Sequence, residues 1–287
     1  MDSNISELAD RFEALLDLKE CLVGVRVART EQEFSEEDAP VTSAEISYCS
    51  AVKLASKGKP VKLPKERCSC GGAKRALGFE EPDEDYFSGR SSCDLGLFSD
   101  ERTASEVARG LKRLDLGSVG AVVMPYGSFS REPMVAIVVT DTYNAMRVVQ
   151  GYTCAFGTQA GLCMTGNQAI CIECTTNPVT LDRLNTSFLC SGARFYGKWG
   201  PSQVGIGIPA HQLEATCEGI KETLNATESR PRKELIARRL EAIGEDTGFI
   251  DYDTTYYLRL ADEHRRELAA RRQRTKDCGG ELHGGRD

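Results

Sequence analysis

Two short cysteine motifs in this chain repeat one pattern of residue types. Residues 70–74 read Cys-Gly-Gly-Ala-Lys and residues 190–194 read Cys-Ser-Gly-Ala-Arg, so each motif places a thiol four residues before a cation. A cysteine thiolate is both a ligand for soft metals and a nucleophile. The motifs therefore predict either a thiolate-bound metal or covalent thiol chemistry.

More cysteines lie near these motifs in ligand-like spacing. Cys68 precedes the first motif by two residues, and Cys171-x-x-Cys174 precedes the second. The chain has 12 cysteines but only 3 histidines, so a metal site would be rich in thiolates, which favours iron-sulfur, zinc or copper(I). The leading hypothesis is an iron-sulfur cluster or another soft metal in a redox or cofactor-handling role. The candidate metal ligands are Cys49, Cys68, Cys70, Cys171, Cys174 and Cys190.

The same residues support a hypothesis from a different class, an enzyme with a cysteine nucleophile that acts on a small anionic substrate. Cys190, or Cys70 in its place, would be the thiolate, with Glu173 as a candidate acid or base. The neighbouring cations and glycines are candidates for cofactor or anion binding, namely Gly72, Gly192, Lys74 and Arg194. A third hypothesis is a non-catalytic small-molecule binding module. The structural alternative is that these cysteines are small buried hydrophobic residues.

The sequence around the motifs also repeats, which predicts the elements that position them. Residues 60–63 read Pro-Val-Lys-Leu and residues 178–181 read Pro-Val-Thr-Leu, while the glycine pattern at 96–97 and 110–112 recurs at 205–206 and 219–221. We interpret this as an internal duplication. The prediction is an α+β protein in which two pseudo-symmetric α/β halves pack as one domain. The halves are residues 1–116 and 117–228, followed by a charged helical extension at 229–287. An approximate twofold would bring Cys70 and Cys190 to equivalent positions.

Periodicity of apolar residues predicts the individual elements. Helices are expected at 4–18, 43–57, 73–77, 99–114, 141–149, 169–175, 210–223, 231–243 and 254–274. Strands are expected at 22–27, 94–98, 119–124, 134–139 and 203–208, with 119–124 and 134–139 forming a hairpin. Residues 275–287 are rich in glycine and polar residues, a composition typical of disorder.

Composition limits the compartment and the partners. The formal net charge is -7 with a pI of about 5.3, which opposes nucleic-acid binding. No apolar run approaches the roughly 20 residues of a membrane-spanning helix, and the first residues are acidic and polar, unlike a secretory signal. The expectation is a cytoplasmic protein that binds neither nucleic acid nor membrane. Its partner would be a small molecule or a redox protein, and the C-terminal helices are candidates for a homodimer contact.

An ordered series of motifs resembles the family catalogued as domain of unknown function number 169. The series comprises residues 134–139, 145–150, 171–173, 190–194 and 205–209, with Cys49 and residues 70–78 matching in the first half. The resemblance covers roughly residues 8–224 and leaves the C-terminal helices outside. The resemblance implies a cytosolic protein of a kind common in anaerobic bacteria and archaea, and the family has no established activity that could be carried over to this chain. The chain departs from the family pattern in its Cys68-Ser69-Cys70 triplet and in Cys174, and both departures add thiols that favour metal binding.

Overall fold

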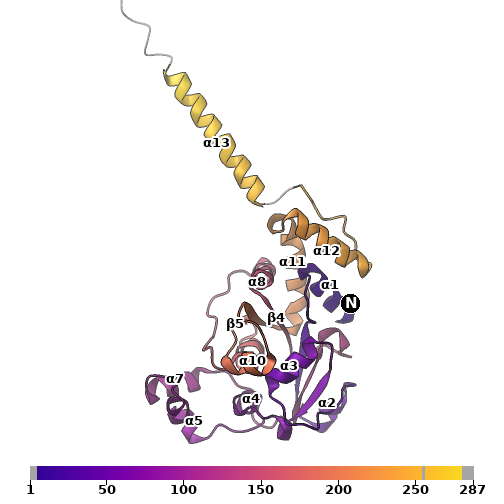
Figure 1. The fold of residues 1–287 in the computed structure, drawn as a ribbon, viewed down its shortest axis with the longest axis vertical. Coiled ribbons are helices and arrows are strands. Elements are labelled where there is room, and N and C mark those ends of the chain that lie inside the picture. The colour runs from indigo at the N-terminus through magenta and orange to yellow at the C-terminus, as the bar shows by residue number, and fades with distance from the viewer. Residues whose placement is uncertain (1–4, 254–255, 280–287) are drawn as a thin grey trace, which may run out of the picture. The chain divides into compact units, whose positions relative to one another are not determined.

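The computed structural model describes residues 5–253 and 256–279. The chain divides into two compact units, Met1–Lys221 and Glu222–Asp287. The first unit combines helices with one antiparallel sheet (Figure 1), which confirms the predicted α+β class.

The sheet has six strands in the order β2-β3-β1-β4-β6-β5, and every neighbouring pair is antiparallel. Its strands are β1 (Val23–Ala28), β2 (Val61–Pro64), β3 (Gly120–Pro125), β4 (Val135–Asp141), β5 (Asn185–Ser187) and β6 (Gln203–Pro209). Side chains alternate between the two faces of a strand, so Val23, Val25 and Val27 of β1 all enter one apolar core. Ala28 enters a smaller cluster with Val122 and Met124 on the opposite face.

The two halves of the sheet, β1-β3-β2 and β4-β6-β5, have the same arrangement of strands from the centre to the edge. β1 and β4 pair in the middle, and each pairs on its outer side with a strand that ends in proline. Val23 of β1 pairs with Pro125 of β3, and Val135 of β4 pairs with Pro209 of β6. Each proline is followed by a short 3₁₀ helix, at 126–128 and at 210–212, and each outer strand then pairs with one short edge strand.

Two predictions about strands are wrong. Segments 119–124 and 134–139 are the strands β3 and β4, but they form no hairpin because β1 lies between them. The central place suits β1, whose residues are nearly all buried. Residues 94–98 are not a strand, since helix α6 (Arg90–Asp94) ends there and Gly96 turns the chain with a φ of 70°. The glycine at 96 is therefore no counterpart of Gly205 in β6, and β3 takes the place that matches β6.

Helices that carry or follow the six predicted ligand cysteines pack on the face of the sheet with the larger core. They are α3 (Tyr48–Ser56), α4 (Gly71–Ala76), the π-helix Ala169–Thr176, α9 (Asn177–Leu181) and α10 (Ser191–Gly197). α10 packs beside α3 (Figure 1). α4 packs beside the π-helix. The three helices that follow α4 in the sequence pack against one another as a separate group. They are α5 (Glu84–Ser88), α6 and α7 (Glu101–Gly110).

The remaining helices of the first unit are α1 (Ile5–Leu16), α2 (Glu31–Ser35), α8 (Thr142–Phe156) and the start of α11 (Leu213–Thr227). α8 packs on β4 and β6, and it meets α11 where a side chain on Gly219 would collide with the backbone of Gly151. The second unit holds the end of α11, α12 (Arg230–Ala242) and α13 (Tyr256–Gly279). In it the fully buried Lys233 donates hydrogen bonds to the carbonyls of Asn225 and Asp251, at 3.0 and 2.5 Å.

Two further predictions concern the ends of elements and the membrane. Residues 275–279, predicted to be disordered, belong to α13, and residues 280–287 lie outside the described part of the chain. Among the described helices, none is both long enough and apolar enough to span a bilayer.

Candidate functional site

Four of the six predicted ligand cysteines line one cavity of about 100 Å³. They are Cys49 from α3, Cys70 before α4, Cys171 from the π-helix and Cys190 before α10. Four segments that are distant in the sequence therefore bring one thiol each to the same place. The rest of the lining consists of Ser47, Gly72, Asn167, Gln168, Ala169, Gly192, Ala193 and Tyr196, which include both predicted glycines.

Cys70 and Cys190 occupy the same local position, the N-cap of a short helix. The N–H of Lys74 donates to the carbonyl of Cys70 at 2.9 Å, and the N–H of Arg194 donates to that of Cys190 at 3.0 Å. The sulfur of Cys190 also accepts a hydrogen bond from the N–H of Ala193 at 3.3 Å. The first N–H groups of a helix have no partner within the helix, so this position places a thiol where backbone donors are available.

Cys49 and Cys171 come from longer segments that are tied to each other. Ser47 caps α3 by accepting the N–H of Ser50 at 3.0 Å, which fixes the helical turn that carries Cys49. The hydroxyl of the fully buried Tyr48 lies 2.9 Å from that of Thr175, and this hydrogen bond joins α3 to the π-helix. The two segments thus hold their thiols in a fixed relation.

Two glycines of β6 let the π-helix approach the sheet closely. A Cβ atom on Gly207 would lie 2.6 Å from the carbonyl carbon of Cys174, and one on Gly205 would lie 2.8 Å from the Cys174 sulfur. Both distances are well inside van der Waals contact. The Gly-Ile-Gly sequence of this strand is therefore a requirement of the helix that carries Cys171.

The other two predicted ligands lie outside the cavity lining. Cys174 is fully buried against β6, on the side of the π-helix that faces the sheet. Cys68 is buried as well, and its S–H points to the carbonyl of Cys70 at 3.8 Å. Burial raises the pKa of the Cys174 thiol well above its usual value and that of Cys68 to about 11.

Burial and mutual repulsion disfavour the charged form of Cys49 and of Cys171. Burial raises the pKa of Cys49 and Cys171 well above the usual thiol value, and the other thiols of the cavity raise it further because like charges repel. Cys70 and Cys190 exert this effect on both of them. Among the described residues, no Lys, Arg, His, Asp or Glu lines the cavity, so no side-chain cation offsets a thiolate there.

The two predicted cations are engaged elsewhere. The Arg194 guanidinium donates to the carbonyls of Gly200, Phe188 and Gln203, the last two at 2.8 and 3.3 Å. It thus fastens the loop after α10 to the start of β6. Lys74 forms an ion pair with Glu80 at 3.8 Å.

Glu173, the predicted acid or base, is fully buried and lies outside the cavity lining. Its carboxylate accepts hydrogen bonds from the N–H groups of Thr165 and Gly166, at 2.6 and 2.9 Å, and from the Ser187 hydroxyl at 2.5 Å. These contacts fasten the loop at 157–168 to the π-helix and to β5. The geometry gives Glu173 a structural task.

Sequence reasoning missed several polar residues at the cavity. Ser47 lies two residues before Cys49 and caps its helix, a position that the sequence signals of a helix start could have revealed. Tyr196 follows Gly192 by one helical turn on α10. Gln168 precedes the π-helix, and nothing in the sequence singles it out. In the described ranges, no set of three or more His, Cys, Asp or Glu side chains is arranged to hold a metal ion.

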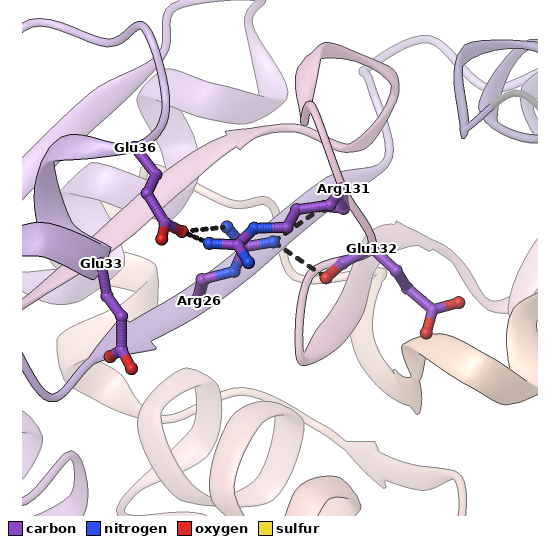
Figure 2. Close-up of a pocket in the computed structure, with 5 residues that line it drawn as sticks. All are labelled: Arg26, Glu33, Glu36, Arg131 and Glu132. Atoms are coloured by element: carbon purple, nitrogen blue, oxygen red, sulfur yellow. Dashed lines mark hydrogen bonds and ion pairs between the residues drawn. The ribbon is translucent and has the colours of Figure 1, made fainter.

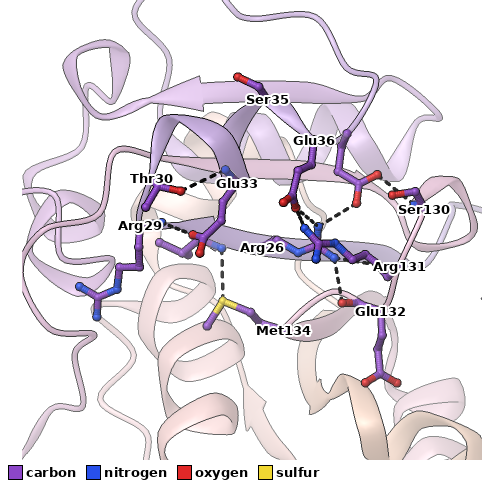
Figure 3. A network of polar contacts seen from close by, with 12 residues as sticks. Arg26, Arg29, Thr30, Glu33, Ser35, Glu36, Ser130, Arg131, Glu132 and Met134 are labelled. Atoms are coloured by element: carbon purple, nitrogen blue, oxygen red, sulfur yellow. Dashed lines mark hydrogen bonds and ion pairs between the residues drawn. The ribbon is translucent and has the colours of Figure 1, made fainter.

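A separate hollow of about 320 Å³ surrounds Arg26 of β1 (Figure 2). The Arg26 guanidinium pairs with Glu37 at 2.8 Å and donates to the carbonyls of Arg131 and Glu132, at 2.8 and 2.9 Å (Figure 3). Arg131 in turn forms an ion pair with Glu36. Because both arginines are bonded to neighbouring segments, the network fastens α2 and the β3–β4 connection to the sheet.

Comparison with known proteins assigns the chain to a family. The model of the family DUF169, described as uncharacterised ArCR, matches residues 11–219, which include all four cavity cysteines. No curated protein matches the chain, and no solved structure matches it. The match covers most of the first unit and ends before the second. The chain belongs to the uncharacterised family DUF169.

Proposed function

We propose that Cys49, Cys70, Cys171 and Cys190 bind a thiolate-ligated metal group, with an iron-sulfur cluster as the leading candidate, for a redox or cofactor-handling role. One observation carries the proposal: four thiols from four separate segments line one small cavity. A packing role would not require all four segments to present a sulfur at the same point.

The electrostatics of the cavity support a cation as the occupant. Thiolates crowded in a buried space repel one another, and no side-chain cation in the described lining offsets them. A metal would supply that charge and displace the protons. In a 4Fe–4S cluster each iron takes one protein thiolate, so the four cysteine sulfurs are spaced more widely than around a single ion. The N–H of Ala193, which already points at the Cys190 sulfur, would tune the potential of such a group.

We also propose that the unit arose by internal duplication. The matching strand order, the equivalent register of β1 with β3 and of β4 with β6, and the N-cap positions of Cys70 and Cys190 support it. Cys49 and Cys171 would then be a second equivalent pair, so each half would contribute two ligands. A reduced thiol site fits the reducing cytoplasm, which we propose as the compartment.

The alternative of a cysteine-nucleophile enzyme has less support from the geometry. A nucleophilic thiolate needs a neighbouring cation or base. Arg194 is bonded to backbone carbonyls, and Glu173 is bonded to Thr165, Gly166 and Ser187. Neither lines the thiol cavity.

Anaerobic purification tests the metal proposal. We expect a coloured protein with charge-transfer absorption in the visible range, and iron and acid-labile sulfide in matched amounts. Replacement of any one of the four cavity cysteines by serine should lower the metal content strongly, because each substitution removes one of the four proposed thiolate ligands. Cys154→Ser is the matched control, since this cysteine is exposed on α8.

Two results would refute the metal proposal. One is a wild-type protein that is folded, colourless and free of iron, zinc and copper after anaerobic purification. The other is metal content that persists in all four serine variants, which would place the metal at another part of the chain.

A further inference from the structure

A larger cavity of about 330 Å³ adjoins the thiol cavity. The two share four lining residues, Cys70, Gly72, Asn167 and Gln168. The other walls of the larger cavity come from α4, from the helical group α5 to α7 with its connecting residues, and from Thr165 in the loop at 157–168. A molecule bound in the larger cavity would therefore lie next to Cys70, at the edge of the thiol cavity.

Arg75 of α4 lines this cavity and has no anionic partner among the residues that the structure describes. The centre of its guanidinium lies 4.5 Å from the centroid of the Tyr86 ring, so it stacks on that ring. Its Nε atom is buried without any hydrogen-bond acceptor. Within the described residues no hydrogen bond or ion pair involves Arg75, whereas Arg113 donates to the carbonyl of Ala108 at 2.7 Å. A buried N–H group without an acceptor is costly, and an anionic ligand would supply one.

A second polar group of the cavity lacks a partner. The amide of Gln168 donates from Nε2 to the Tyr86 hydroxyl at 3.3 Å, while its Oε1 atom is buried without a donor. Asp83, the one carboxylate that the described residues contribute to the lining, caps α5 by accepting the N–H of Tyr86 at 2.8 Å. The cavity thus offers a guanidinium donor and, separately, an amide oxygen that can accept from a hydroxyl.

The remaining wall is apolar. Leu95 and Leu97, with 75% and 47% of their surface exposed, lie at the cavity together with Phe98, Val107 and Leu111. Leucines this exposed gain from cover by an apolar group.

We propose that this cavity binds a small organic carboxylate with an apolar body and a hydroxyl group. The carboxylate pairs with the Arg75 guanidinium, the hydroxyl donates to the Gln168 amide oxygen, and the body covers the leucines. The binding needs only the side chains of this cavity and does not depend on a metal at the four thiols.

Calorimetric titration of the full-length protein with 3-phenyllactate tests the proposal. We expect saturable binding, weakened at least about tenfold by Arg75→Met because a charge-assisted hydrogen bond is lost. The neutral 3-phenyllactamide should bind more weakly by a similar factor. 3-Phenylpropanoate lacks the hydroxyl, so it should bind to wild type more weakly than 3-phenyllactate does. In Gln168→Leu, which lacks the amide oxygen, the two ligands should bind equally tightly. Arg102→Met is the matched control, since Arg102 pairs with Glu106 at the surface of α7.

Failure of the carboxylate proposal can be distinguished from failure of the metal proposal. Arg75→Met should keep the metal content of wild type, and Trp199 fluorescence shows whether the variant is folded. In metal-free protein, 3-phenyllactate should slow the alkylation of Cys70 and leave that of Cys154 unchanged, as read by peptide mass spectrometry. The inference is overturned if none of the carboxylates saturates below about 10 mM, if folded Arg75→Met binds as tightly as wild type, or if Cys70 is not protected.

Discussion

Replacement of Gly207 by alanine should destabilise the first unit through one contact. Gly207 lies in β6 beneath the π-helix, directly below the backbone of Cys174. A Cβ atom there would lie 2.6 Å from the carbonyl carbon of Cys174 and closer still to its carbonyl oxygen, whereas ordinary contact begins at 3.4 Å. The π-helix must therefore move away from the sheet by at least about 0.8 Å, the difference between these distances.

The cost of this movement is large because neither partner is a flexible side chain. The added Cβ atom is fixed to the backbone of a strand that is paired on both sides, and it meets the backbone of a fully buried helix. Overpacking a tight core costs roughly 1 to 3 kcal/mol, and a backbone collision lies at the upper end, so we expect a loss of about 3 kcal/mol. The same shift moves Cys171, so the variant should also hold less metal.

Urea unfolding followed by Trp199 fluorescence measures the loss. Trp199 is the one tryptophan of the chain, is 4% exposed and packs in the core cluster that includes Cys171. Its signal therefore reports on the first unit, without a contribution from α12 or α13.

Gly110→Ala is the matched control, because a Cβ atom on this residue would meet no other atom within 4 Å. Its stability should equal or exceed that of wild type, since alanine favours a helix. If Gly207→Ala loses less than about 1 kcal/mol, or no more than the control, then the inferred close approach of the π-helix to β6 is wrong.

Two further predictions follow from buried groups. Glu173→Gln should lower the free energy of unfolding, measured in urea, by about 2 to 3 kcal/mol, because the charge-assisted hydrogen bonds from the Thr165 and Gly166 N–H groups are weakened. A variant as stable as wild type would contradict the structural role of Glu173. The pKa of Cys49 and of Cys171 is raised in the folded protein, so their stabilising effect is complete below the unfolded thiol pKa and is lost as pH rises above it. Metal-free protein should lose up to about 1.4 kcal/mol per pH unit for each of these two thiols above roughly pH 8.5, and an unchanged slope in Cys49→Ala/Cys171→Ala would refute it.

The sequence by itself determined the local chemistry of the thiol motifs. Cys70 and Cys190 were predicted as a repeated pair, and the structure places both at the N-cap of a helix. This is a local property, since a cysteine followed by small residues and glycine can begin a short helix wherever it occurs. Strands and helices with clear periodicity, such as β1, α3 and β6, were predicted for the same reason.

Only the tertiary structure decided which thiols share the cavity. Cys171 and Cys174 are three residues apart, yet Cys171 lines the cavity and Cys174 faces β6. The wider turn of the π-helix places the two side chains on different sides of the helix. The place of β1 between β3 and β4 depends on pairing between segments about 100 residues apart, which no local pattern encodes. Likewise Lys74 and Arg75 are neighbours of similar charge, and only the packing of α4 against Tyr86 places Arg75 in a cavity while Lys74 pairs with Glu80.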